Sequence, residues 1–156
     1  MTMIEEVSCI LRKNNLKLCV AESFTGGLVA SSFVSLAGAS DIFVTSLVCY
    51  AEQAKKALLG VSDYTLKEYG AVSEQTVSEM LDGLKRLSLG DVFVATSGNA
   101  GPTSEKPNEV GLFYLGVMFK DRKIIKKYQV SGNRQEVINQ GAQNSFDLIL
   151  QVLSDI

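Results

Sequence analysis

The chain has 156 residues, of which 46% are hydrophobic, and it contains no histidine. This length suits one domain with a sizeable core and is too short for two domains of ordinary size. The net charge of −2 gives no general attraction to nucleic acid or to an anionic membrane, and the absence of histidine excludes a Ser-His-Asp triad, a Cys-His pair and a His-ligated zinc site within the chain.

Apolar periodicity and capping residues predict alternating helices and strands in the first half of the chain. Helices are expected near residues 2–14, from Gly26 onward and within 50–60, and strands near 17–21 and 42–49. Two further helices follow, each opened by a serine that suits an N-cap position. The first begins at Ser62 and stops near Gly70, and the second begins at Ser73 and ends at Gly90.

The second half of the chain predicts a strand, a long loop, a hairpin and a final helix. In chain order these are a buried strand over 91–97, a loop over 98–108, hairpin strands over 112–119 and 123–130, and a helix over about 134–153. Helices that alternate with strands early and a hairpin late are typical of an α/β fold. We therefore expect a three-layer α/β/α sandwich with a mixed, mainly parallel sheet, formed by a single domain over 1–156.

Cysteine usage and the N-terminal segment indicate the surroundings in which the chain works. Cys9, Cys19 and Cys49 are odd in number, lack CxxC spacing and lie in apolar segments, so we expect buried free thiols in a reducing compartment. Glu5 and Glu6 stand where a signal peptide would be basic, and no apolar run approaches membrane-spanning length. The expectation is a cytoplasmic protein without a membrane partner.

The segment 21–27, Ala-Glu-Ser-Phe-Thr-Gly-Gly, ends the first strand and opens the next helix. It should face the carboxyl edge of the sheet, where open α/β sheets bind ligands. Ser23 and Thr25 have two interpretations there, as helix caps or as active-site hydroxyls. The segment matches neither the Gly-x-Ser-x-Gly nucleophile elbow nor a P-loop. Glu22 either orients the site or favours the helix N-terminus.

A serine nucleophile without histidine would need a carboxylate, a tyrosine or a lysine of lowered pKa as its base. Positions 51, 54, 55, 58 and 59 share one face of the helix within 50–60, and all are apolar except Lys55. Lys56 falls on the polar side beside Glu52, as an ordinary solvated lysine would. Lys55 either extends its ammonium to water or is buried and acts as a base. Tyr50 is either core packing or a phenol that hydrogen-bonds into the same cleft.

Several short motifs occur in order along nearly the whole chain. They are Ala-Glu-Ser-x-Thr-Gly-Gly at 21–27, Tyr-x-x-x-x-Lys at 50–55, Leu-Leu-Gly-Val at 58–61, Gly-Ala-Val-Ser-Glu at 70–74, Gly-x-Ala-Gly-Pro at 98–102, Glu-Lys-Pro at 105–107 and Ser-Gly-x-Arg at 131–134. With these motifs the sequence resembles the C-terminal domain of the competence/damage-inducible CinA family, whose stand-alone enzymes are nicotinamide mononucleotide amidohydrolases.

The resemblance implies a serine nucleophile, Ser23, and a lysine general base, Lys55, assisted by Thr25 and Tyr50. It implies pyridine nucleotide salvage, in which the carboxamide of nicotinamide mononucleotide is hydrolysed to nicotinate mononucleotide and ammonia through an acyl-enzyme. Neither a metal nor another cofactor is expected, and the partner is a small-molecule pyridine nucleotide rather than nucleic acid. Because this family commonly forms homo-oligomers, we expect the same of this chain.

The implied reaction also needs an oxyanion site and a phosphate site. Backbone N–H groups near Thr25, Gly26 and Gly27 are expected to stabilise the oxyanion. The residues expected to hold the phosphate are the loop residues Gly98, Asn99, Ala100 and Gly101 and the side chains of Lys106 or Arg134. The alternative for Arg134 is a solvated arginine in the first turn of the last helix.

Some positions depart from the family pattern. Phe24 stands in place of the usual Cys, Asn99 in place of an aliphatic residue, Thr103-Ser104 in a glycine-rich stretch, Asn108-Glu109 as added length, and Thr45-Ser46-Leu47 in a stretch that usually contains Arg and Gly. We expect these changes to cluster at the pocket rim and to alter specificity more than chemistry. The alternative function is a non-catalytic nucleotide-binding or protein-interaction module linked to competence or DNA damage.

Overall fold

The computed structural model describes residues 1–106 and 109–156, so Pro107 and Asn108 of the long loop lie outside the described residues. The helices are α1 (Met3–Lys13), α2 (Leu28–Val34), a short 3-10 helix η1 (Ala39–Asp41), α3 (Glu52–Leu59), α4 (Asp63–Tyr69), α5 (Glu74–Arg86) and α6 (Arg134–Leu153). The strands are β1 (Leu18–Glu22), β2 (Phe43–Val48), β3 (Val92–Gly98), β4 (Leu112–Phe119) and β5 (Arg122–Gln129).

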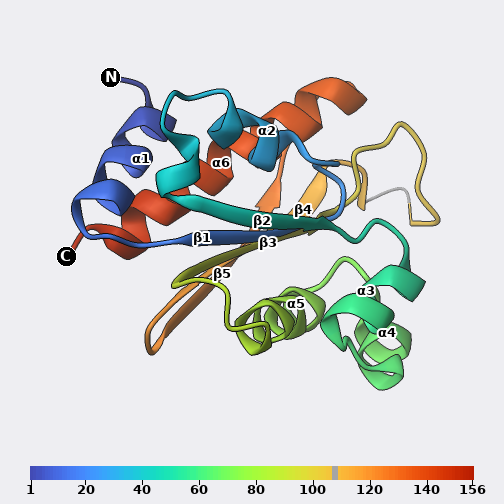
Figure 1. The fold of residues 1–156 in the computed structure, drawn as a ribbon. Helices are drawn as coiled ribbons and strands as arrows, with labels where there is room; N and C mark the ends of the chain where they lie inside the picture. The colour runs from blue at the N-terminus through green and yellow to red at the C-terminus, as the bar shows by residue number, and fades with distance from the viewer. Residues whose placement is uncertain (107–108) are drawn as a thin grey trace.

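The strands form one mixed sheet in the order β2-β1-β3-β4-β5 (Figure 1). β1 pairs in parallel with β2 and β3, whereas β4 pairs antiparallel with both β3 and β5. Four strands therefore run in one direction, and β4 alone runs in the other. The expected mixed, mainly parallel sheet with a late hairpin is confirmed.

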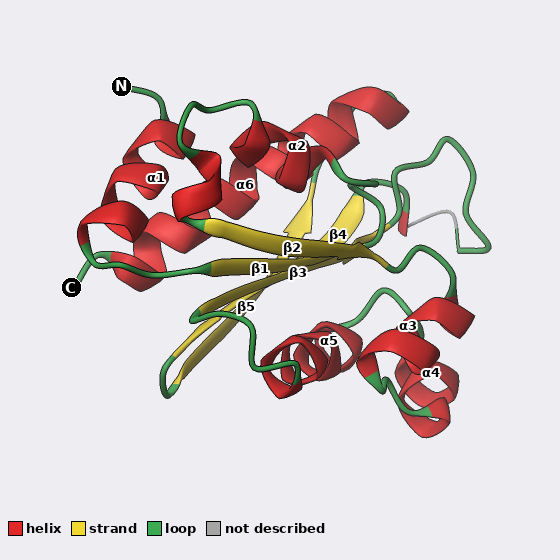
Figure 2. Cartoon of the chain, viewed as in Figure 1, coloured by secondary structure: helices red, strands yellow, loops and turns green. Residues whose placement is uncertain are grey.

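Helices cover both faces of this sheet, which gives the expected three layers (Figure 2). α1, α2 and α6 lie on one side, and α3, α4 and α5 lie on the other. Leu18 and Val20 of β1 belong to the hydrophobic cluster of the first side, and Cys19 and Ala21 to that of the second. Successive strand residues point to opposite faces, so a strand covered on both faces must be apolar throughout.

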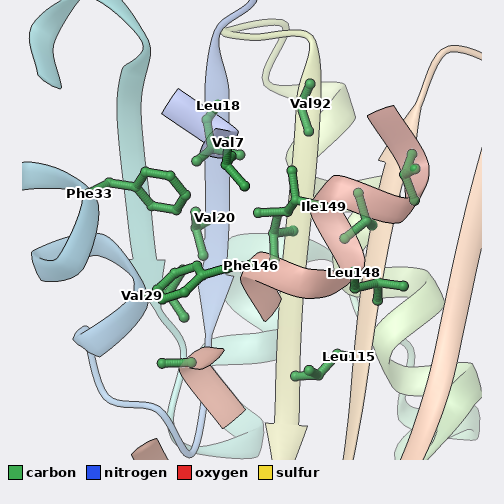
Figure 3. Packing of buried hydrophobic residues seen from close by; sticks show 14 of the residues in the cluster. Val7, Leu18, Val20, Val29, Phe33, Val92, Leu115, Phe146, Leu148 and Ile149 are labelled. Atoms are coloured by element: carbon green, nitrogen blue, oxygen red, sulfur yellow. The ribbon is translucent and has the colours of Figure 1, made fainter. Parts of the chain in front are cut away.

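The larger cluster lies between the sheet and α1, α2 and α6 (Figure 3). Phe33 of α2 and Phe146 of α6 meet edge to face there, with ring centroids 5.5 Å apart. Figure 3 places both rings beside Val20 and Val29, at the two ends of the turn 21–27. The segment that carries the candidate nucleophile is therefore anchored on both sides by core packing.

The predicted boundaries hold closely for β4 and α6, and two others differ for identifiable reasons. α5 ends at Arg86 rather than at Gly90. Gly90 instead passes close to β1, where an added Cβ would lie 2.7 Å from Cys19 Sγ and 2.9 Å from the Lys17 carbonyl oxygen. α2 begins at Leu28 rather than at Gly26, because Gly26 and Gly27 adopt positive φ angles of 58° and 103° and form the turn itself.

Two expectations concerned the surroundings of the chain. Cys19 and Cys49 are buried free cysteines, but the expectation of burial is wrong for Cys9, which is exposed on α1. Cys9 lies off the helix face that Val7 and Leu11 bury. Within residues 1–106 and 109–156, no helix has both the length and the apolar character needed to cross a membrane.

Candidate active site

The turn between β1 and α2 borders a cavity of about 650 Å³. Its lining residues are Ser23, Phe24, Thr25, Gly26, Gly27, Leu28, Ser31, Val48, Tyr50, Arg134, Gln135 and Ile138. They come from the carboxyl ends of β1 and β2, from α2 and from the first turns of α6. The cavity thus lies at the sheet edge where ligands bind in open α/β folds.

Ser23 and Lys55 meet beneath this cavity. Lys55 Nζ donates to Ser23 Oγ at 2.9 Å, although the two residues are 32 positions apart. The same nitrogen donates to the backbone carbonyls of Cys49 at 2.9 Å and Tyr50 at 3.0 Å. The two carbonyls fix the lysine nitrogen, and its remaining contact is the serine oxygen.

Lys55 is only 1% exposed, so its side chain does not extend to water. Desolvation by burial lowers the pKa of its ammonium below the ordinary value of 10.5, and Cys49 and Glu52 oppose this effect only in part. No carboxylate forms an ion pair with Lys55 among the described residues. A lysine of lowered pKa beside a serine hydroxyl can accept the proton of that hydroxyl.

Of the two neighbouring lysines of α3, Lys55 is the buried one, as its helix phase predicts, but the apolar face is narrower than expected. Leu59 is buried together with Lys55, whereas Leu58 is 53% exposed. Lys56 lies on the polar side, as expected, but its ion-pair partner is Asp63 at the start of α4 rather than Glu52. α3 spans only two turns and packs mainly against α5, so a narrow stripe suffices to anchor it.

Glu22 is a fully buried carboxylate at the end of β1, and it faces the start of α2. Its oxygens accept from the N–H groups of Gly27 at 3.2 Å, Val29 at 2.9 Å and Ala30 at 3.0 Å. The hydroxyl of Ser46 on β2 donates to it at 3.0 Å. The Glu22 carboxylate therefore supplies the negative charge that the positive end of α2 favours. Both interpretations of Glu22 apply, because it caps the helix and thereby fixes the turn.

This arrangement corrects the expectation that Gly26 and Gly27 offer free N–H groups. The Gly26 N–H donates to the Ser23 carbonyl at 3.1 Å, and the Gly27 N–H is held by Glu22. The N–H groups of Phe24 and Thr25 have no acceptor among the described residues. Buried backbone donors are nearly always paired, so two unpaired ones at the cavity wall are suited to bind a ligand oxygen.

Thr96 on β3 is a site residue that the sequence analysis missed. Its fully buried hydroxyl accepts from the Ser23 N–H at 3.1 Å and lies 2.9 Å from the Thr25 hydroxyl. The available signal was weak: Thr96 and Ser97 are two hydroxyl residues near the carboxyl end of a mainly apolar strand that neighbours β1. Thr25 is thus joined to Ser23 through a third hydroxyl rather than directly.

Tyr50 and Arg134 lie on the outer side of the cavity. The Tyr50 side chain is 61% exposed, and its hydroxyl accepts from Arg134 Nη2 at 3.0 Å. Arg134 Nη1 donates to the Gly101 carbonyl at 2.5 Å. No carboxylate lies within ion-pair distance of this guanidinium among the described residues, so its charge is available to an anionic ligand. The Tyr50 phenol contacts neither Ser23 nor Lys55.

The other residues expected to bind the phosphate do not line this cavity. Asn99 and Lys106 line a separate cavity beside Glu52 and Tyr69. The Asn99 amide donates to Ser104 Oγ at 2.9 Å, and Lys106 forms an ion pair with Glu109 at 3.8 Å. Ala100 is buried, and Gly98 packs against Phe113 and Phe24. Among the loop residues that the structure describes, only Gly101 is joined to the cavity, through Arg134.

Phe24 does line the cavity, but its ring points into the core rather than to the pocket rim. Phe24 is 4% exposed and stacks on Phe113 with centroids 5.1 Å apart. The ring lies between two glycines, since an added Cβ would come within 3.0 Å of it at Gly98 and 2.4 Å at Gly141. Because the Phe24 ring is packed in the core, it is the Phe24 backbone that a ligand in the cavity would contact. Thr103 is exposed and does not line the cavity, and Asn108 lies outside the described residues.

No cluster of three or more histidine, cysteine, aspartate or glutamate residues suited to a metal ion occurs in the part of the chain that the structure describes. The site itself offers a buried serine hydroxyl, a lysine nitrogen, paired threonine hydroxyls, two unpaired N–H groups and an arginine.

Comparisons with known proteins give a consistent result. The family model described as the CinA C-terminal domain matches residues 1–153. A CinA-like protein from Kosmotoga olearia is 40% identical over 150 residues, which cover 96% of this chain and 36% of that protein. A CinA-like protein from Thermotoga neapolitana is 40% identical over 154 residues, which cover 98% of this chain and 38% of that protein. The chain thus spans little more than a third of the length of these relatives.

Solved structures of similar length share the fold. A CinA superfamily protein from Klebsiella pneumoniae has a TM-score of 0.94 at 27% sequence identity, and the match covers 99% of this chain and 97% of that one. A competence/damage-inducible protein from Agrobacterium tumefaciens has a TM-score of 0.89 at 29% identity, with the same coverage of both chains.

Proposed function

Because the chain belongs to the CinA C-terminal domain family, we propose that it is an amidohydrolase that converts nicotinamide mononucleotide to nicotinate mononucleotide and ammonia. The observation that carries this proposal is the 2.9 Å contact between buried Lys55 Nζ and Ser23 Oγ at the wall of a 650 Å³ cavity. A nucleophile and its base within hydrogen-bond reach are the signature of covalent catalysis.

The neutral form of Lys55 fits the site as well as the ammonium does. A neutral amine has two N–H donors and one lone pair. The donors would bind the carbonyls of Cys49 and Tyr50, and the lone pair would then accept the proton of Ser23. As that proton moves to Lys55, Ser23 Oγ bonds to the amide carbon and the carbonyl electrons move onto the oxygen.

The N–H groups of Phe24 and Thr25 are the proposed oxyanion donors. When the C–N bond breaks, the proton held by Lys55 leaves with the nitrogen as ammonia, and an ester on Ser23 remains. A water molecule then gives its proton to Lys55 and attacks the ester. The acid product leaves as Ser23 recovers that proton, and it ionises to the carboxylate by losing the second proton of the water to solvent.

Arg134 is the proposed partner of the substrate phosphate. Its guanidinium lines the cavity, is fixed by Tyr50 and Gly101, and has no carboxylate partner among the described residues. This gives the substrate two points of attachment, its carboxamide at Ser23 and its phosphate at Arg134. Tyr50 would then orient the arginine rather than transfer a proton.

The test is ammonia release from nicotinamide mononucleotide. We expect turnover by the wild type, and a loss of at least about a thousandfold in kcat for both Ser23→Ala and Lys55→Ala. Lys56→Ala is the matched control and should retain wild-type activity, because Lys56 pairs with Asp63 at the surface. Binding of the nucleotide without turnover by the wild type would contradict the proposal and would favour the non-catalytic binding module.

A further inference from the structure

β1 and β3 separate at the residue before the candidate nucleophile. Their parallel pairing extends to Ala21 opposite Ala95, and Ser23 is the first residue beyond β1. The Ser23 N–H is accepted by the side-chain oxygen of Thr96 rather than by a backbone carbonyl of β3. A side chain thus replaces the sheet ladder at the point where the chain turns toward α2.

The protons of this cluster have one assignment that pairs every buried donor. Thr96 Oγ1 must accept from the Ser23 N–H, and its only other neighbour among the described residues is Thr25 Oγ1. Thr96 is fully buried, so its own proton has to be donated to Thr25. If Thr25 donated to Thr96 instead, the Thr96 proton would be buried without an acceptor. The proton of Thr25, which lines the cavity, is then free for a ligand.

We propose that Thr96 is a positioning residue that fixes the Ser23 turn and makes Thr25 a hydrogen-bond donor to the nitrogen of the reacting carboxamide. This inference rests on the proposed amidohydrolase function. An amide nitrogen has no available lone pair, whereas the nitrogen of the tetrahedral intermediate has one. Thr25 can therefore donate only after Ser23 has attacked. Thr25 supplies a hydrogen bond and no net proton: it holds the nitrogen by its single lone pair until Lys55 delivers the proton taken from Ser23, and that proton then replaces the hydrogen bond as ammonia leaves.

An interaction made only after attack should affect kcat and leave KM unchanged. Thr96→Val removes the hydroxyl with little change of shape, and Thr96→Ser keeps it. Ser97→Ala is the matched control, because Ser97 is the next buried hydroxyl of β3 and donates to the Ala71 carbonyl at 2.7 Å, away from the cavity. Thermal unfolding of all three variants verifies that each is folded.

With nicotinamide mononucleotide, Thr96→Val should lower kcat by at least about tenfold with KM within about twofold of the wild type. Thr96→Ser and Ser97→Ala should stay within about threefold in kcat. The proposal is overturned if Thr96→Val keeps its kcat, if Thr96→Ser fails to restore it, or if Ser97→Ala loses as much.

Reaction with a fluorophosphonate separates this proposal from the proposed function. The reagent labels an activated serine without requiring the natural substrate, and intact mass measures the rate of labelling. Should the wild type be labelled at Ser23 yet fail to hydrolyse the nucleotide, the amidohydrolase proposal fails. The role of Thr96 in fixing Ser23 then stands if Thr96→Val is labelled at least about tenfold more slowly than Thr96→Ser and Ser97→Ala, and falls if the rates are equal.

Discussion

At the scale of single residues, the main feature of the site is a lysine nitrogen that is placed by backbone carbonyls. Cys49 and Tyr50 directly follow β2, and Lys55 reaches back from α3 to both of them. Carbonyl oxygens accept hydrogen bonds without carrying a full negative charge, so they orient the nitrogen without the strong preference for the ammonium that a carboxylate would impose. The environment therefore favours a lysine that titrates below its ordinary range.

The pH dependence of activity should reveal this titration. Only neutral Lys55 can accept the Ser23 proton, and burial lowers its pKa, so kcat/KM should rise with pH along a limb whose midpoint lies below 10.5. Lys55→Arg should remain inactive at every accessible pH, because a guanidinium does not lose its proton in proteins. Initial rates of ammonia release at a series of pH values measure the pH dependence of the wild type and the inactivity of Lys55→Arg. A limb centred at or above 10.5 would contradict the prediction.

The same pKa change makes stability depend on pH with a definite sign. The Lys55 pKa is lower in the folded state than in the unfolded state, so the unfolded chain binds more protons in the interval between the two values. The free energy of unfolding should therefore rise with pH through that interval, up to about 10.5. Lys55→Met lacks this group, so its stability advantage over the wild type should shrink as the pH rises. Urea unfolding of both proteins at a series of pH values measures this difference in the free energy of unfolding. A stability advantage of Lys55→Met that grew with pH would contradict the prediction.

At the scale of elements, the turn between β1 and α2 is fixed from three directions. Glu22 binds the first N–H groups of α2, Thr96 holds the Ser23 N–H, and the Phe24 ring packs between Gly98 and Gly141. Each contact comes from a different part of the chain. The turn can therefore leave the Phe24 and Thr25 N–H groups unpaired without relaxing into a regular helix.

Sequence patterns predicted this element only in part. The residues at 21–27 correctly predict a turn between β1 and a helix, but they start that helix at Gly26, whereas Gly26 and Gly27 adopt positive φ and belong to the turn. The role of Glu22 remained open, since a carboxylate before a helix has the same pattern whether it is exposed or buried. The role of Thr96 and the inward position of Phe24 depend on contacts with β3, β4 and α6; Thr96, for example, is 73 positions from Ser23. No local periodicity encodes such contacts.

Replacing the Glu22 carboxylate should loosen this element. In Glu22→Gln, an amide group loses the charge and can bring N–H donors toward the N–H groups of Gly27, Val29 and Ala30. We expect a loss of about 2–3 kcal/mol in the free energy of unfolding, since a buried network loses charged hydrogen bonds. Urea denaturation measures it.

Glu79→Gln is the matched control for this change. Glu79 accepts one backbone hydrogen bond, from the Ser62 N–H at 3.0 Å, at the start of α4. Loss of a single partly buried hydrogen bond of this kind should lower the free energy of unfolding by no more than about 1 kcal/mol. Equal losses in the two variants would show that the Glu22 network adds nothing beyond an ordinary cap.

At the scale of the whole molecule, the cavity is assembled from segments distant in the sequence. The turn between β1 and α2 carries Ser23, the helix that follows β2 carries Lys55, and α6 closes the far wall with Arg134. The pairing of Ser23 with Lys55 was foreseeable from helix phase and from the motifs. The Arg134 side of the cavity was not foreseeable, because the described part of the loop over 98–106 is joined to the cavity only at Gly101, and no pattern distinguishes Arg134 from Lys106 as the cation that faces it.

Substrates with and without a phosphate should separate the two ends of this cavity. Arg134→Gln removes the proposed phosphate partner while leaving Ser23 and Lys55 untouched, so KM for nicotinamide mononucleotide should rise by at least about tenfold. KM for nicotinamide riboside, which lacks the phosphate, should change by less than about twofold. Lys106→Gln, the other candidate cation, should leave both values near those of the wild type, because Lys106 lies at a separate cavity. Steady-state ammonia release from both substrates measures this, and an equal rise in KM for the two would mean that Arg134 supports the fold of the site rather than the phosphate.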